Sequence, residues 1–160
     1  MNQVSLKQFG DLIKEIDQCN GNNKKINLIA EFIKDIDPSN GCWTLSLLMN
    51  IRQKRLITGK KLREILQTHT TMPSWLFDDC FAQVGDSAET LSLLWPQIKE
   101  ELNSKTLKCP EDIEILYSEM NSTKPLHWWM ETLLPIIKSK AGIEQENSMI
   151  ELWKKIPEKE

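Results

Sequence analysis

Apolar residues recur along this chain at helical spacing, and this pattern constrains the fold more than any other feature. Phe9, Leu12, Ile13 and Ile16 fall at i, i+3, i+4 and i+7, on one face of a helix that Ser5 can cap. No stretch alternates apolar and polar residues at period two for long enough to form a sheet. The sequence therefore predicts an all-α protein, a single compact multi-helix domain with about nine helices.

Capping residues, Gly and Pro divide the chain into the expected helices. A second helix is expected over 24–36, with an inward row of isoleucines at Ile26, Ile29, Ile33 and Ile36. A third, over 41–50, is apolar on nearly every side and is predicted to lie in the middle of the domain. Later helices are expected to begin at Thr58, at Pro73 (ending at Gly85), at Asp86 or Ser87 (ending at Trp95 and Pro96), at Pro110, at His127 (kinked or split by Pro135 and ended by Gly142) and at Gln145. The polar passage 97–108 is either a continuation or a loop.

Composition indicates a globular protein inside the cell. The 160 residues suit one domain, and 40% hydrophobic with 27% charged residues is ordinary. No apolar run approaches the length needed to span a bilayer, and the N-terminal residues do not resemble a signal peptide. The four cysteines lack the paired spacing of a zinc site, which favours free, buried thiols in a reducing compartment. A cytoplasmic location is expected.

Six tryptophans lie within or at the edge of apolar helical faces. Exposed aromatic rings can stack on nucleic-acid bases, but aromatic residues on such faces are far more often core anchors. We therefore expect Trp75 to be buried, with base stacking as the alternative.

The run NIRQKRLITGKKLR, residues 50–63, concentrates the positive charge of the protein. It contains no acid, and all three arginines of the chain lie in it; its six cations are Arg52, Lys54, Arg55, Lys60, Lys61 and Arg63. Outside it, 14 Lys and Arg face 23 Asp and Glu. Such segregation favours contact with a polyanion, although a solvated helix end is an equally open interpretation.

The expected helix after Thr58 would place three of these cations in and near its first turn. Basic side chains there oppose the helix dipole slightly. The same position suits a site in which exposed N–H groups and cations face phosphates. The predicted phosphate-binding residues are Arg52, Lys54, Arg55, Thr58, Lys60, Lys61 and Arg63.

Motifs for catalysis are not found in the sequence. The six glycines are isolated, so no phosphate-cradling loop is present, and neither Lys-x-Asp-Gly nor Gly-x-Ser-x-Gly occurs. His69 is predicted to lie in a turn, and His127, next to two tryptophans, at the edge of the core. From its residues alone, the chain is interpreted as a binding module with no cofactor of its own.

Three runs carry a resemblance to a known family. They are FGDLIKEIDQCNGNNKKINLIAEFI, GCWTLSLLMNIRQKRLITGKKLREI and, most specifically, MPSWLFDDCFAQVGDSAETLSLLWP. Their order and content resemble the N-terminal DNA-binding domain of bacterial ATP-dependent DNA ligases of the helicase-associated type. The similarity covers most of residues 1–100 and returns more weakly near the Leu-Pro-Ile-Ile and Ile-Glu-Leu-Trp segments.

The resemblance implies a function for the whole chain. It implies sequence-independent binding of nicked double-stranded DNA through the phosphate backbone, in DNA repair, replication and recombination. The family's nucleotidyltransferase and OB-fold domains are missing, so residues 1–160 are expected to be the excised N-terminal part of a longer ligase. ATP and Mg²⁺ are then expected only for the full-length enzyme, whose catalytic core would be this domain's partner. The isolated domain is expected to be a monomer, without ligase activity.

Two other classes of function stay open. One is a helical protein–protein adaptor whose basic segment docks on an acidic partner. The other is a small enzyme whose site assembles from scattered residues.

Overall fold

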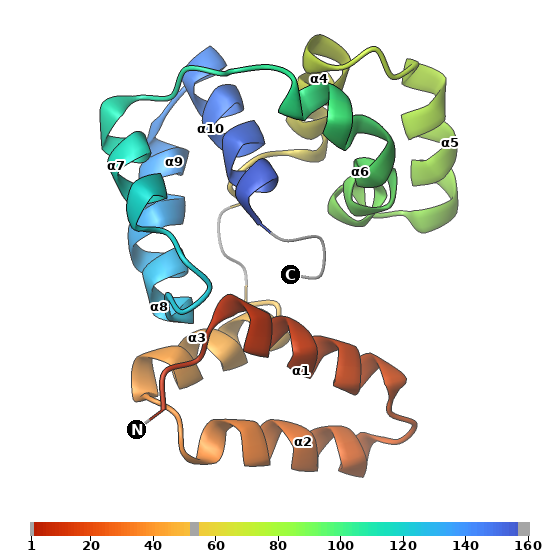
Figure 1. Ribbon diagram of the computed structural model, residues 1–160. Helices are drawn as coiled ribbons and strands as arrows, with labels where there is room; N and C mark the ends of the chain where they lie inside the picture. The colour runs from red at the N-terminus through yellow and green to blue at the C-terminus, as the bar shows by residue number, and fades with distance from the viewer. Residues whose placement is uncertain (1, 52–54, 157–160) are drawn as a thin grey trace. The chain divides into compact units, whose positions relative to one another are not determined.

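The computed structural model describes residues 2–51 and 55–156 (Figure 1). Ten α-helices and one π-helical turn account for the regular structure of these residues, which otherwise contain two isolated β-bridges and no strand. The all-α prediction is confirmed, and the count differs slightly from the expected nine because one expected helix is divided into three. None of the described helices combines the length and apolar character needed to cross a bilayer.

The described helices group into two compact units. Of the described residues, unit 1 comprises 2–51 and 112–136, and unit 2 comprises 55–111 and 137–156. Unit 1 contains α1 (Leu6–Gln18), α2 (Asn22–Lys34), α3 (Pro38–Leu48), most of α7 (Glu111–Glu119), α8 (Leu126–Trp128) and the π-helical η1 (Trp129–Leu133). Unit 2 contains α4 (Gly59–His69), α5 (Ser74–Val84), α6 (Ser87–Asn103) and α10 (Gly142–Lys155), and the division falls within α9 (Leu134–Ser139).

In unit 1, α1 begins where the sequence predicted. The Ser5 hydroxyl accepts the Gln8 amide and the Gln8 side chain accepts the Ser5 amide, a reciprocal cap. Phe9 is buried against Val4 and Leu126, and the Leu126 amide donates to the Val4 carbonyl at 2.7 Å. The helix therefore packs on a segment more than a hundred residues away in sequence.

The second helix differs from its prediction on one face. It begins at Asn22, and Ile26 is 60% exposed although it was expected to point inward. Ile29 and Ile33 are half-buried. The isoleucine spacing predicts a helical face correctly, but that face is wider than the surface that covers it in unit 1.

The third helix starts three residues earlier than predicted, because Asp37 caps it and Pro38 occupies its first position. Asn50, with φ of +48°, ends it: the Ile51 amide donates to the Ser46 carbonyl and the Asn50 amide to the Leu47 carbonyl. Leu45 is exposed, so the helix is less central than its composition suggests.

Proline explains the division of the expected helix 127–140. Pro135 has no N–H and its ring crowds the carbonyl four residues back. The chain widens into the π turn η1 just before it, and the Leu134 amide reaches the Trp129 carbonyl. Gly142, predicted to end this helix, instead begins α10 with φ of +56°.

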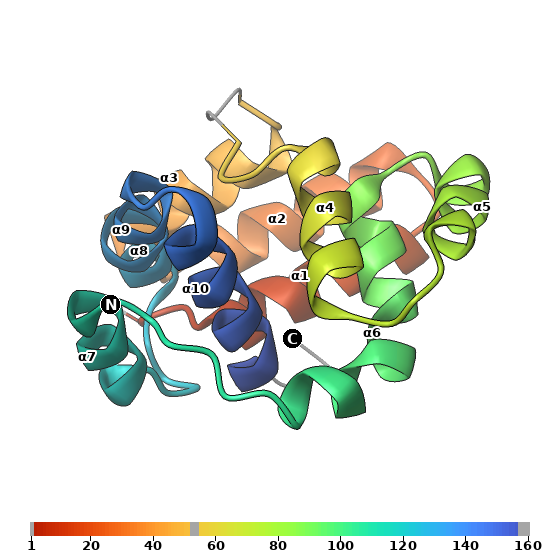
Figure 2. The same ribbon diagram turned by 90° about the horizontal axis from the view of Figure 1, so that it is seen from above.

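In unit 2, α6 contacts α4, α5 and α10 (Figure 2). Their shared core has Leu66, Leu94, Ile98 and Ile150 at its centre. The expected stop at Pro96 is wrong: α6 passes through Pro96 and continues to Asn103, after which residues 105–110 form a loop. Helix α5 starts at Ser74, one residue later than predicted, and Gly85 ends it with φ of +80°, as expected.

The burial of the tryptophans also corrects the sequence prediction. Trp75 is 61% exposed, because it lies on the side of α5 opposite the buried Phe77. Trp129 is buried, and the remaining four are half-buried. Trp95 and Trp153 meet edge to face at 6.4 Å in unit 2. The expectation that Trp75 anchors the core is therefore wrong. All four cysteines are free; Cys42 is exposed and the other three are half-buried, so none is a fully buried thiol.

We predict that Trp75→Ala lowers the free energy of unfolding by less than about 1 kcal/mol, because truncating an exposed side chain leaves no cavity. Trp129→Ala is the matched comparison and should lower it by about 3–5 kcal/mol. Chemical denaturation followed by circular dichroism measures both. A loss at Trp75 as large as that at Trp129 would contradict the observed exposure.

Candidate functional site

The candidate residues that the structure describes lie in unit 2, at and before the start of α4. Arg55 is exposed in the preceding segment, Thr58 caps the helix, and Lys60, Lys61 and Arg63 occupy its first two turns, as predicted. Arg52 and Lys54 lie outside the described residues.

Two contacts fix the start of α4. The Thr58 hydroxyl accepts the Lys61 amide at 3.2 Å, which confirms the predicted cap. Gly59 lies directly against the start of α6, where an added Cβ would overlap Ser87 Oγ and lie 3.2 Å from Ser87 Cβ. Glycine at this position therefore allows the two helix N-termini to meet.

Glu146 of α10 holds α4 through two basic side chains. Lys61 Nζ donates to Glu146 Oε1, and His69 Nε2 lies 3.2 Å from Glu146 Oε2. The Lys61 and Glu146 side chains are 29% and 13% exposed, and that of His69 is 10% exposed. His69 was expected in a turn, but it is the buried last residue of α4. These contacts make Lys61 a structural residue of unit 2.

The ionisation of this pair follows from the contacts. Burial alone would raise the pKa of Glu146, but hydrogen bonds from Lys61 and His69 outweigh it and hold that pKa below its ordinary value. The hydrogen bond to Glu146 raises the pKa of Lys61. Both groups are therefore charged at neutral pH, as a stable ion pair requires.

Two further acids face the basic helix. Arg63 Nη2 donates to Asp78 Oδ2 of α5 at 2.5 Å, and Lys60 Nζ lies 3.9 Å from Glu64 Oε1 one turn on. The sequence showed a basic run without acids, but the fold brings Asp78 from the next helix, α5, and Glu146 from α10. The basic residues that are separated from acids along the sequence are therefore not fully separated from them in the folded protein.

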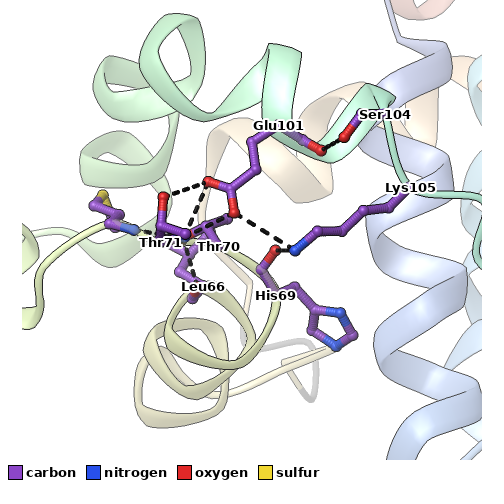
Figure 3. A network of polar contacts seen from close by, with 8 residues as sticks. Leu66, His69, Thr70, Thr71, Glu101, Ser104 and Lys105 are labelled. Atoms are coloured by element: carbon purple, nitrogen blue, oxygen red, sulfur yellow. Dashed lines mark hydrogen bonds and ion pairs between the residues drawn. The ribbon is translucent and has the colours of Figure 1, made fainter.

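The other end of α4 is held by Glu101 of α6 and by Lys105 just after it, as Figure 3 shows. Both Glu101 carboxylate oxygens accept the Thr71 amide at 2.9 Å, and Lys105 Nζ donates to the His69 carbonyl at 2.5 Å. The backbone hydrogen bond from Thr71 lowers the pKa of Glu101, although burial opposes the shift. The positive charge of Lys105 near the C-terminal carbonyls also interacts favourably with the negative end of the helix dipole. Polar contacts therefore hold helix α4 near both of its ends.

What stays open to solvent is a small basic surface at the start of α4 and in the segment before it. Lys60 is 87% exposed at its side chain, Arg55 and Thr58 are exposed, and Arg63 is 41% exposed beside Asp78. Solvent-exposed cations beside a helix that is held in place suit binding of phosphates. Among the described residues, no group of three or more His, Cys, Asp or Glu is placed to hold a metal ion.

Sequence reasoning missed the acids and one histidine. Glu146 lies 85 residues from Lys61, and no local pattern connects them. His69 did carry a signal, because it follows Leu62, Ile65 and Leu66 at i+7 on the same apolar face.

Comparisons with known proteins identify no relative: the chain matches no protein-family model, no curated protein and no solved structure. The resemblance described above therefore depends on its sequence motifs alone.

We predict that Glu146→Gln lowers the free energy of unfolding by about 1.5–3 kcal/mol at neutral pH, because Lys61 loses a charged partner. The pKa of Glu146 is lower in the folded protein than in the unfolded chain. This stabilisation is therefore present above the pKa of the unfolded state and is lost as the pH falls through the pKa of the folded state. The difference between variant and wild type should therefore shrink below about pH 4.5, the ordinary value. Denaturation across pH measures it.

Glu144→Gln supplies the control for this experiment, because Glu144 is exposed on the same helix. It should change stability by less than about 0.5 kcal/mol. An effect of Glu146→Gln that is equal to the control, or independent of pH, would contradict the role assigned to Glu146.

Proposed function

We propose that the start of α4 and the segment before it bind duplex DNA through its phosphate backbone, without reading base sequence. The observation that carries this proposal is the pair of exposed cations, Arg55 and Lys60, at the start of a helix fixed by Thr58, Gly59 and Glu146. Lys60 lies on this helix, whose backbone is already held in place, so less conformational freedom is lost when it binds a phosphate.

The motif resemblance supports the identity of the partner. If residues 1–160 act as the helical domain of an ATP-dependent ligase, the substrate is nicked duplex DNA and the joining chemistry belongs to a separate core. A ligase must accept any sequence, so phosphate contacts and duplex shape suit its task better than contacts to base edges. In this proposal the protein acts as a monomer in the bacterial cytoplasm.

Charge limits the strength of the interaction. The chain carries a formal net charge of −3, and Lys61 and Arg63 already face carboxylates. We therefore expect weak binding by the isolated chain, at the micromolar-or-weaker level of non-specific DNA contacts.

A second candidate function, protein docking, is favoured by two exposed apolar side chains of unit 2. Trp75 is 61% exposed on α5 and Leu93 is 58% exposed on α6. Exposed aromatic residues frequently anchor protein interfaces. Salt dependence separates the two functions, because release of DNA counterions gives a steep slope of log K against log salt.

We predict that the double variant Arg55→Ala, Lys60→Ala weakens binding to several unrelated duplexes equally. Each lost phosphate contact should flatten the salt slope by about 0.9. Fluorescence anisotropy over a range of salt measures both effects. The control is Lys7→Ala, Lys24→Ala, which removes the same charge from exposed positions on α1 and α2 of unit 1. Equal effects of the two double variants would argue for net charge alone and against a site on α4.

We also predict that the chain forms no covalent adenylate with ATP and Mg²⁺. Adenylation needs a lysine nucleophile supported by a metal and by cations on the phosphates. Incubation with labelled ATP followed by denaturing electrophoresis tests this. A stable adenylated lysine would instead support the enzyme interpretation.

A further inference from the structure

The ion pair between Arg63 and Asp78 lies at the surface of unit 2, beside the exposed cations of α4. Arg63 Nη2 donates to Asp78 Oδ2 at 2.5 Å, and the two side chains are 41% and 49% exposed. A carboxylate and a phosphodiester each offer a guanidinium two anionic oxygens in similar geometry. Asp78 therefore gives Arg63 an anionic partner of the same kind as a phosphate.

The other interhelical pair of α4 has a different character. Lys61 and Glu146 are 29% and 13% exposed, and the second oxygen of Glu146 faces His69 at 3.2 Å. Removing one partner from such a pair leaves a partly buried charge without a counter-charge. Replacing Glu146 by another anion is therefore unfavourable. Arg63 and Asp78 both keep contact with water, so separating them costs far less.

The guanidinium of Arg63 is also incompletely satisfied. Its Nε is buried and has no hydrogen-bond partner among the described residues. Asp78 therefore does not hold Arg63 in the side-on, two-bond arrangement that makes arginine–carboxylate pairs strong. This one-ended contact leaves the arginine head free to turn toward another anion.

We propose that Asp78 stands in for a DNA phosphate and is exchanged for one on binding. In the free protein Asp78 holds Arg63, and in the complex a backbone phosphate takes its place. Asp78 then lowers the affinity for DNA in two ways: it competes for Arg63, and once released it repels the backbone. This inference depends on the proposed DNA-binding function.

Two neighbouring acids allow a matched test. Asp79 is exposed like Asp78 and follows it on α5, but it makes no ion pair with the residues that the structure describes. Asp78→Asn and Asp79→Asn remove the same charge at adjacent positions. In anisotropy titrations with a labelled nicked duplex, Asp78→Asn should raise the affinity about two- to fivefold more than Asp79→Asn, the strength of an exposed ion pair expressed as a ratio.

A second background isolates the role of the arginine. With Arg63→Ala present, Asp78→Asn should raise the affinity only as much as Asp79→Asn does, because no guanidinium is left to release. Chemical denaturation of each variant verifies that the fold is kept.

The outcomes separate this inference from the proposed function. If the wild type binds duplex DNA with a steep salt slope but the two Asn variants gain equally, or Asp78→Asn loses affinity, the exchange is overturned and DNA binding stands. If neither the wild type nor any variant binds duplex DNA at low salt, both are overturned. Binding that appears only in Asp78→Asn would support the exchange strongly.

Discussion

The arrangement of unit 2 depends on one carboxylate, that of Glu146. It contacts Lys61 in the first turn of α4 and His69 at its last residue, so a single carboxylate of α10 connects the two ends of the helix. The buried face between these contacts, Ile65 and its neighbours, supplies the hydrophobic stabilisation. The carboxylate also fixes the rotation of α4 about its axis and its position along α10, because Lys61 and His69 must both reach Glu146. The exposed side of the helix, with Lys60 and Arg63, is positioned as a consequence.

Local chemistry predicted much of this region. Thr58 caps α4, Leu62, Ile65 and Leu66 form its buried face, and Gly85 ends α5, because each effect acts within a few residues. Long-range contacts decided the rest. Trp75 has the spacing of a core residue, but no helix covers its side of α5 in unit 2. Asp78 and Glu146 meet α4 only after folding, so no pattern in residues 50–63 could reveal that Arg63 and Lys61 have carboxylate partners.

The two kinds of ion pair on α4 suggest how a basic helix can serve structure and binding together. The partly buried pair of Lys61 and Glu146 holds the helix, since breaking it is unfavourable, and exposed cations remain available to a ligand because water already solvates them. A basic helix that is held in place loses less conformational entropy on binding a polyanion than a flexible basic segment would. The contacts of Glu101 and Lys105 at the other end of the helix add to its rigidity.

Neither compact unit is a continuous piece of the chain, and this affects how the protein forms during synthesis. Val4 shares a hydrophobic cluster with Leu126 in unit 1, and Leu62 shares one with Ile150 in unit 2, so each cluster is complete only after the later residue has been made. At about 5–20 residues per second, a ribosome needs roughly 6–24 s to make the 120 or so residues that separate the first pair. Through that interval α1 can pack on α2 and α3, but its contact with Leu126 is missing, and closing such long loops slows folding. Each core is therefore completed only when the later segments of its unit have been made.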